Sequence, residues 1–178
     1  MSAVTPWGLL AEFEDVPSLL HASQAVREAG YTRWDAHTPF PVHGLNDAMG
    51  LAPTRLPLVV FAAGLTGCSS FLLLQWWTNA VDYAFNISGK PFFSIPANIP
   101  VTFEGTILLA AITAFVGMLV ANKLPHWYHP VFKSSRFARA TNDRFFISIE
   151  RADPSFDPVA TRSLLEAAGA VVVEELED

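Results

Sequence analysis

Histidine and cysteine are the side chains of this sequence that are best suited to hold a redox cofactor. None of the five histidines lies in the two long uncharged stretches of the chain; they are His21, His37, His43, His126 and His129. A b-type haem between membrane helices needs histidines inside them. The single cysteine, Cys68, excludes an internal disulfide, a C-x-x-C-H haem attachment and a self-contained iron–sulphur site. The sequence therefore predicts no haem, metal or other cofactor in this chain.

One carboxylate stands at the start of an uncharged stretch. Glu104 immediately precedes residues 105–122, and a carboxylate on a lipid-facing helix is costly unless it meets water or a partner. It is either an interfacial group that the helix dipole favours by ~0.3–1 kcal/mol, or a proton-handling group or an anchor to another subunit. Thr102 and Thr106 are close enough in sequence to help solvate it. The residues leave these interpretations open.

The composition is that of a membrane protein with polar flanks. Of 178 residues, 51% are hydrophobic and only 16% are charged, which is unusual for a soluble protein. Residues 56–81 and 105–122 carry no charge, and each reaches the ~18 residues that indicate a transmembrane helix. The net charge of −6 lies almost wholly in the flanks, so nothing indicates nucleic-acid binding.

The first flank has the pattern of a βαβ unit. A strand is expected at residues 7–13, and Asp15 is placed to cap a helix over residues 18–29. Gly30 then ends the helix, and a second strand follows near residues 31–38.

The second flank repeats this pattern. Apolar residues alternate along 144–151, with Phe145, Ile147 and Ile149 on one side. Asp157 and Pro158 start a helix, and a strand is expected at residues 170–174. Both halves together predict an α+β fold with an antiparallel four-stranded sheet and two helices on one face. This is a split ferredoxin-like domain (βαβ–βαβ) with a transmembrane hairpin inserted between the halves. Phe145, Ile147 and Ile149 should then share one core with Leu19 and Val26.

These patterns divide the chain into five segments. They are the first βαβ half with a pre-membrane segment (1–55), transmembrane helix 1 (56–81), a periplasmic loop (82–100), transmembrane helix 2 (101–122), and an inner interfacial segment with the second βαβ half (123–178). The loop has one basic residue, Lys90, whereas several follow the second helix. Because basic residues accumulate on the cytoplasmic side, both termini are predicted to be cytoplasmic.

Small residues in the predicted helices indicate close helix packing. Gly64 and Cys68 are four residues apart, Gly67 lies between them, and Gly117 is available in the second helix. Gln75 is placed to form a hydrogen bond across the same interface. A separate group is expected at the membrane surface: His43, His126, Trp127, Tyr128 and His129. His126 and His129 would share one face if their segment were helical.

Four segments of the sequence resemble one known family. They are PVHGLNDAMGL (41–51), IPVTFEGT (99–106), LPHWYHPVF (124–132) and RFARATNDRFF (136–146). Together they resemble the ActD subunit of bacterial alternative complex III. One departure is Gly105, where the family pattern Phe-Glu-Leu-Thr has leucine.

The resemblance implies a place in a quinol-oxidising complex of the bacterial inner membrane. It implies large polysulphide-reductase-type membrane subunits as partners, with haem c and iron–sulphur clusters in other subunits and no cofactor in this one. The predicted function is therefore a non-catalytic subunit, for assembly and stabilisation, of a respiratory or photosynthetic electron-transfer complex. The alternative is an accessory or regulatory subunit of a transporter, with a ligand-sensing ferredoxin-like domain.

Overall fold

The computed structural model describes residues 6–177. Residues 1–5 and 178, which belong to the predicted first and last segments, lie outside the described residues. The prediction that both termini are cytoplasmic concerns these residues. The chain separates into two compact units. One consists of Met1–Ala52 with Trp127–Asp178, and the other of Pro53–His126.

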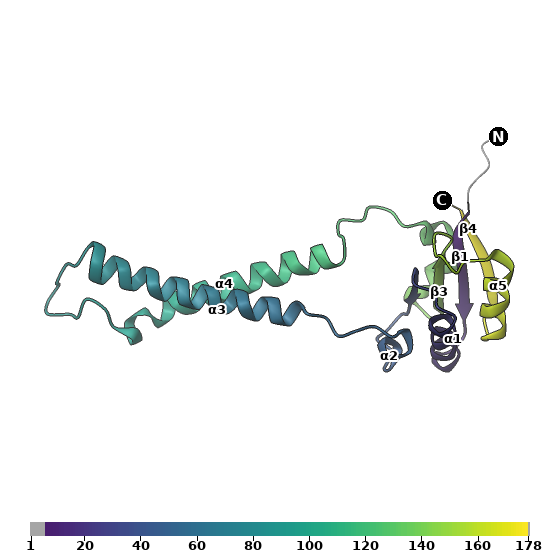
Figure 1. The fold of residues 1–178 in the computed structure, drawn as a ribbon, viewed down its shortest axis with the longest axis horizontal. Helices are drawn as coiled ribbons and strands as arrows, with labels where there is room; N and C mark the ends of the chain where they lie inside the picture. Colours follow the sequence, from purple (N-terminus) through teal and green to yellow (C-terminus); the bar gives the residue numbers. More distant parts are fainter. Residues whose placement is uncertain (1–5, 178) are drawn as a thin grey trace, which may run out of the picture. The chain divides into compact units, whose positions relative to one another are not determined.

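A four-stranded antiparallel sheet forms the centre of the first unit (Figure 1). Its strands are β1 (Pro6–Phe13), β2 (Trp34–His37), β3 (Phe145–Glu150) and β4 (Val172–Glu177). Their order in the sheet is β2-β3-β1-β4, and every neighbouring pair is antiparallel. Strands from the two ends of the sequence therefore alternate in one sheet, so neither polar flank could form it alone.

Two helices have the N-cap residues that the sequence predicts, although the first helix begins at Val16 rather than at residue 18. In α1 (Val16–Glu28) the Asp15 carboxylate accepts a hydrogen bond from the Ser18 N–H at 2.9 Å, and Gly30 follows with a φ of 84°. In α5 (Pro158–Ala167) the Asp157 carboxylate accepts from the N–H groups of Val159 and Ala160. A short helix, α2 (Leu45–Met49), is tied to α1 by a 2.7 Å hydrogen bond from the Arg27 guanidinium to the Asp47 carbonyl.

Both long helices of this unit cover one face of the sheet. Phe145, Ile147 and Ile149 are buried in one cluster with Leu19 and Val26, as predicted. Leu165 of α5 lies in the same cluster, and the side chain of Ile147 is 0% exposed. This core joins residues that are more than 100 positions apart in the sequence.

The opposite face of the sheet is also covered, which the alternating pattern of β3 did not predict. Two 3-10 helices, η2 (Pro130–Lys133) and η3 (Arg136–Thr141), supply Val131 and Ala140 to a second core with Leu10 and Phe146. Ser148, the polar side of the β3 pattern, is only 2% exposed. The segment that follows the second apolar helix thus makes the sheet the middle of three layers.

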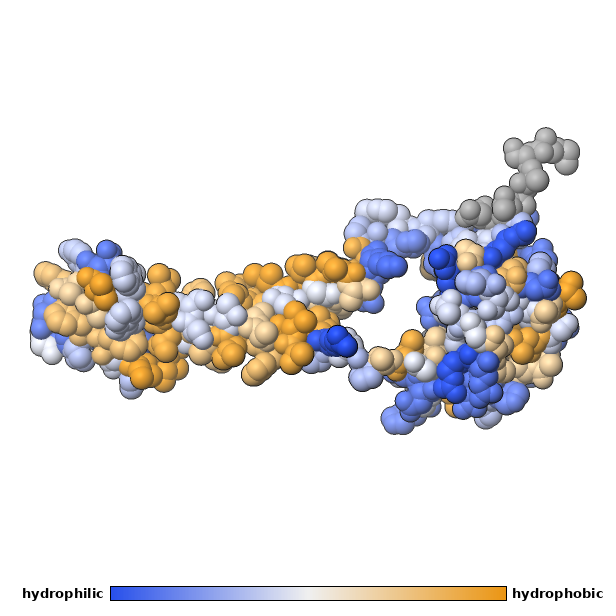
Figure 2. Space-filling model, viewed as in Figure 1, coloured by the Kyte–Doolittle hydropathy of each residue, from blue (hydrophilic) through white to orange (hydrophobic). Residues whose placement is uncertain are grey.

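The second unit is a hairpin of two apolar helices. α3 (Leu56–Trp76) continues into a π-helical turn, η1 (Trp77–Asp82), and α4 (Ile95–Ala121) packs along it (Figure 1). Each is long and apolar enough to cross a membrane. Figure 2 shows hydrophobic residues over most of the visible hairpin surface. Most side chains that point away from the partner helix are apolar, as lipid or other membrane subunits require.

Several predicted boundaries differ from the structure; β2, for example, covers Trp34–His37 rather than residues 31–38. α4 begins at Ile95 rather than at residue 101, so the loop is shorter than predicted. Pro100 suggested a helix start, but inside α4 it removes only one backbone hydrogen bond, near the helix's beginning. β4 occupies Val172–Glu177 rather than 170–174, because its register follows β1, which pairs with it from Pro6 to Glu12.

Candidate functional site

At Gly67 the backbones of α3 and α4 approach each other closely. A Cβ atom at this position would lie 2.7 Å from the Gly105 carbonyl oxygen and 3.1 Å from the Thr106 Cα. At Gly64 the space is larger, since a Cβ would be 3.7 Å from the Ala110 Cβ. Gly117 lies against Leu56 at the other end of the hairpin. Three of the four residues singled out for helix packing therefore lie in the contact between α3 and α4.

Cys68, the fourth residue of that set, lies beside this contact. It is half-buried and lines a shallow apolar groove of about 340 Å³ together with Thr102 and Thr106. Its thiol is free.

A polar connection crosses the apolar interface near the loop end. The Gln75 side-chain amide donates to the Thr102 hydroxyl at 3.0 Å and to the Asn98 carbonyl at 3.3 Å, as expected for this residue. Thr102 in turn donates to the Asn98 carbonyl at 2.9 Å, and Thr106 donates to the Thr102 carbonyl at 2.7 Å. All these groups are half-buried or buried, so lipid need not solvate them.

Glu104 lies on a different face of α4 from the two threonines. Residues two positions apart on an α-helix project about 200° apart, so Thr102 and Thr106 face α3 while Glu104 is exposed. The threonines therefore do not solvate the carboxylate as one interpretation supposed. Glu104 is nine residues beyond Ile95, or about 13 Å along the helix. For α4 centred in a ~30 Å hydrocarbon layer, this position lies inside the layer rather than at its edge.

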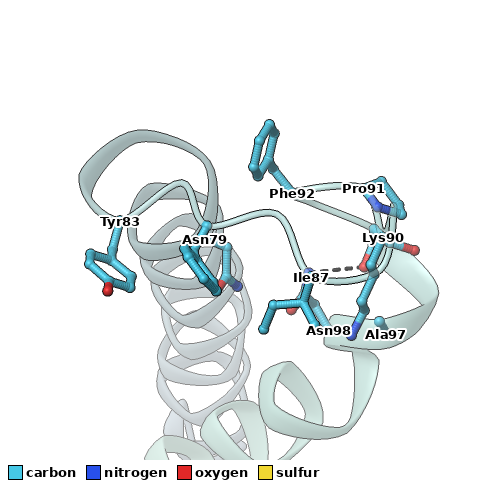
Figure 3. Close-up of a pocket in the computed structure, with 10 residues that line it drawn as sticks. Asn79, Tyr83, Ile87, Lys90, Pro91, Phe92, Ala97 and Asn98 are labelled. Atoms are coloured by element: carbon cyan, nitrogen blue, oxygen red, sulfur yellow. Dashed lines mark hydrogen bonds between the residues drawn. The ribbon is translucent and has the colours of Figure 1, made fainter.

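A hollow of about 280 Å³ occurs at the loop end of the hairpin (Figure 3). Its lining includes Asn79 of η1 and Tyr83, which directly follows η1. Lys90 of the loop and Ser94 and Asn98 at the start of α4 also line it. In Figure 3 the Lys90 side chain runs back toward α4 beside Ala97 and Asn98. The hollow thus combines one ammonium group with amide and hydroxyl groups. Sequence reasoning noted Lys90 for its charge alone.

The residues predicted to be interfacial have different local environments. His43 is exposed just before α2, and His126 is exposed in a segment without regular structure, so the proposed helix face of His126 and His129 is wrong. Trp127 and Tyr128 are 92% and 50% exposed. His129 caps η2, where its Nδ1 accepts from the Val131 N–H at 3.4 Å, and its ring meets Trp7 edge-on at 4.9 Å.

The second face of the sheet holds a charged cluster that sequence reasoning missed. The Glu12 carboxylate in β1 is 4% exposed, and three arginines surround it: Arg136 at 3.2 Å, Arg144 at 3.4 Å and Arg139 at 3.6 Å. All three follow the second apolar helix in sequence. The cluster therefore ties that segment to a strand from the other end of the chain. A charged residue in a strand of otherwise apolar residues was the available signal.

A second buried carboxylate joins the two halves on the helix side. Asp153, 4% exposed, accepts hydrogen bonds from the N–H groups of Thr32 and Arg33, both at 2.6 Å, and from the Ser155 N–H at 2.8 Å. Burial alone would raise its pKa, but these hydrogen bonds to the ionised form outweigh burial and lower the pKa. The turn after β3 is thereby fixed to the segment before β2.

His37 on β2 lies on the same face of the sheet as the charged cluster, and η3 covers both. Its Nε2 lies 3.0 Å from the Ser148 hydroxyl, and its ring meets Phe137 edge-on at 4.9 Å. Burial lowers the pKa of His37; Asp35 opposes this effect and His129 adds to it. His37 is therefore a neutral, packed residue at pH 7. Among residues 6–177, no three His, Cys, Asp or Glu side chains are grouped to hold a metal ion.

Comparison with protein families matches residues 7–175 to the family described as Alternative complex III, ActD subunit. The chain belongs to this family. Membership in the ActD family makes it a subunit of alternative complex III, a quinol-oxidising electron-transfer complex. It supports the first predicted function rather than the transporter alternative. A comparison with curated proteins found no match.

The resemblance predicted a leucine at position 105, where this chain has a glycine. Gly105 is buried beneath the ring of Phe71, and a Cβ at this position would overlap that ring. A leucine at position 105 therefore requires a smaller or displaced side chain at position 71. The carbonyl oxygen of Gly105 is also the atom closest to a Cβ at Gly67, so both glycines lie in the same close contact of α3 and α4.

Proposed function

We propose that this chain is a non-catalytic, cofactor-free subunit that assembles and stabilises the membrane part of alternative complex III. Its hairpin would pack against large polysulphide-reductase-type membrane subunits, whereas haem c and iron–sulphur clusters belong to other subunits. The observation that carries the proposal is Glu104, an exposed carboxylate on an otherwise apolar face of a membrane-length helix. Lipid does not solvate such a group, but a donor on a neighbouring subunit does.

The proposal places the chain in the bacterial inner membrane with the loop in the periplasm. Arg55 and Lys123 flank the open end of the hairpin, and further arginines follow in the sheet unit, whereas Lys90 is the one basic residue at the loop end. The positive-inside rule then puts the sheet unit in the cytoplasm. Reporter fusions after Gly89 and at the C-terminus should report periplasm and cytoplasm; the reverse pair of signals contradicts this orientation.

We assign the sheet unit to the split ferredoxin-like arrangement. The order β2-β3-β1-β4 with antiparallel neighbours, and helices α1 and α5 on one face, support this assignment. α3 and α4 come between β2 and β3 in the chain, which agrees with a hairpin inserted at the β2–β3 connection. Because neither half completes the sheet, both flanks have to lie on one side of the membrane.

Substitution of Glu104 tests the anchor. Glu104→Gln and Glu104→Leu should lower the amount of this subunit that remains with the complex after detergent extraction, with the larger loss for leucine. Quinol oxidation per assembled complex should be unchanged. The matched control is Asp82→Asn, because Asp82 is the only other acidic residue of the hairpin unit and lies at the helix end. It should leave retention unchanged.

Other outcomes separate the remaining interpretations. Normal retention with slower turnover and a shifted pH profile would assign Glu104 to proton handling. Normal retention and normal turnover in both variants would exclude both roles and mean that Glu104 lies at the membrane surface rather than inside the layer. Purification of the tagged chain from native membranes tests the wider proposal, since c-type haem should co-purify and give its visible absorption bands.

A further inference from the structure

The hollow at the loop end of the hairpin has the composition of a site for an anion next to an apolar surface. Lys90 brings three ammonium donors, and Asn79, Tyr83 and Ser94 add neutral donors. Most of the remaining lining is apolar or aromatic, including Phe85, Ile87 and Phe92. A ligand with a negative head and an apolar body would match both parts.

The loop is built so that Lys90 is held at the edge of this hollow. The Gly89 N–H donates to the Asn86 side chain at 3.0 Å, and the Lys90 N–H donates to the Ile87 carbonyl at 3.0 Å. Ser88 and Gly89 both adopt positive φ, 54° and 72°, which closes the turn. Figure 3 shows the Lys90 side chain directed toward Ala97 and Asn98 from this turn, with the Phe92 ring pointing the other way.

The charge of Lys90 has no acidic partner in the hollow. No ion pair of Lys90 occurs among the described side chains, and the one acidic residue of the loop end, Asp82, is outside the lining. Asn98 is 8% exposed and its side-chain N–H₂ already donates to the Ser94 carbonyl at 2.9 Å, so it forms a fixed wall. The ammonium group, with the neutral donors of Asn79, Tyr83 and Ser94, is then available to a ligand.

The position of the hollow indicates the source of the anion. It lies between the ends of two helices that are each long enough to cross a bilayer. Aromatic residues surround it, as at the headgroup level of a membrane. We propose that the hollow binds the phosphate of an anionic phospholipid of the leaflet at the loop end, with its glycerol and upper acyl chains against the aromatic wall. The inference rests on the proposed membrane function.

Native mass spectrometry of the complex tests this site. The complex is reconstituted in nanodiscs of equal parts phosphatidylglycerol and phosphatidylcholine, and this subunit is released by collisional activation. The released wild-type subunit should carry one phosphatidylglycerol. Lys90→Gln should lower the ratio of lipid-bound to lipid-free subunit about fivefold, which corresponds to ~1 kcal/mol for one lysine at an anionic surface. Lys90→Arg should keep the lipid. Lys123→Gln, the same charge change at the open end of the hairpin, should also keep it.

Each other result overturns the lipid site. An equal lipid-bound fraction in Lys90→Gln means that Lys90 does not hold the phosphate. Equal retention of phosphatidylcholine removes the role of charge, and an adduct of free phosphate alone identifies a soluble anion. A carbodiimide cross-link from Lys90 to a carboxylate of another subunit shows a protein partner. If the subunit is absent from the complex altogether, the proposed function fails instead, so the two failures are distinguishable.

Discussion

The contact between Gly67 and Gly105 leads to the most direct test of the hairpin. In Gly67→Ala the new Cβ would lie 2.7 Å from a backbone carbonyl oxygen of α4. Ordinary contact begins near ~3.5 Å, so the helices must separate by about 0.8 Å. No flexible side chain can move away to relieve the overlap. Overpacking of this kind costs ~1–3 kcal/mol.

Gly64→Ala provides the matched control in the same helix. Its Cβ would meet the Ala110 side chain at 3.7 Å, which is ordinary van der Waals contact. Both substitutions carry the same gain in helix propensity, ~1 kcal/mol in water. This gain cancels in the comparison. The free energy of hairpin opening should therefore be lower in Gly67→Ala than in Gly64→Ala by ~1–3 kcal/mol, or about 5- to 150-fold in the opening equilibrium.

Energy transfer between two dyes measures this difference in the full chain. The dyes are attached to cysteines at the exposed positions Leu58 and Met118 in a Cys68→Ser background. The micelle is then titrated with dodecyl sulphate until the helices separate. Gly67→Ala should open at a lower detergent fraction than Gly64→Ala. Identical transitions in the two variants would refute the close backbone approach on which the packing argument depends.

Three further predictions concern the sheet unit, and hydrogen–deuterium exchange of β1 and β3 peptides in the full chain measures them. Ile147→Ala removes a fully buried side chain and should lower the free energy of local opening by ~2–5 kcal/mol, while Val159→Ala at a position that is 75% exposed should have little effect. Glu12→Gln removes the buried carboxylate that three arginines share and should cost ~3 kcal/mol, against ~0–1 kcal/mol for Glu14→Gln, whose exposed carboxylate pairs with Arg144 alone. Asp153→Asn should destabilise the unit at neutral pH, and the difference from wild type should shrink below pH 3.8, the ordinary pKa of the group.

The sign of the Asp153 effect follows from its lowered pKa. A carboxylate whose pKa is lower in the folded state stabilises the protein above its unfolded pKa and loses this contribution as the pH falls through the folded value. A difference that stays constant down to the lowest pH would show that the charge of Asp153 plays no part. Equal protection of β3 in Ile147→Ala and Val159→Ala would exclude Ile147 from a shared core. Likewise, equal effects of Glu12→Gln and Glu14→Gln would mean that the arginines do not depend on Glu12.

Local signals in the sequence determined most of the elements. Asp15 and Asp157 carry side chains that accept from the first helical N–H groups, and Gly30 adopts a positive φ at no steric cost, so these helix ends depend only on neighbouring residues. The same holds for the two uncharged stretches, because length and composition suffice to define a membrane-length helix. Alternation along β3 also identified the residues that face the core.

Contacts between distant residues decided the rest. The residues near Pro100 do not decide whether it begins α4 or lies inside it. Inside the helix it removes one backbone hydrogen bond, and this loss is tolerated because the hydrogen bond between Gln75 and Asn98 holds that part of α4 against α3. The ends of β4 follow its pairing with β1, more than 150 residues away in the chain. Glu12 is buried because arginines far along the chain pair with it.

The sequence by itself thus determined the family, the two membrane-length helices, and the caps and faces of the sheet unit, since each depends on residue order or on neighbours within a few positions. Only the tertiary structure decided which way Glu104 points. Helix geometry puts Glu104 and the two threonines on different faces of α4, but it does not say which face packs against α3. The tertiary structure alone also showed that Gly67 meets Gly105 at the hairpin contact and that Lys90 borders a hollow. Those arrangements depend on how one helix packs against another, and no local pattern encodes that distance.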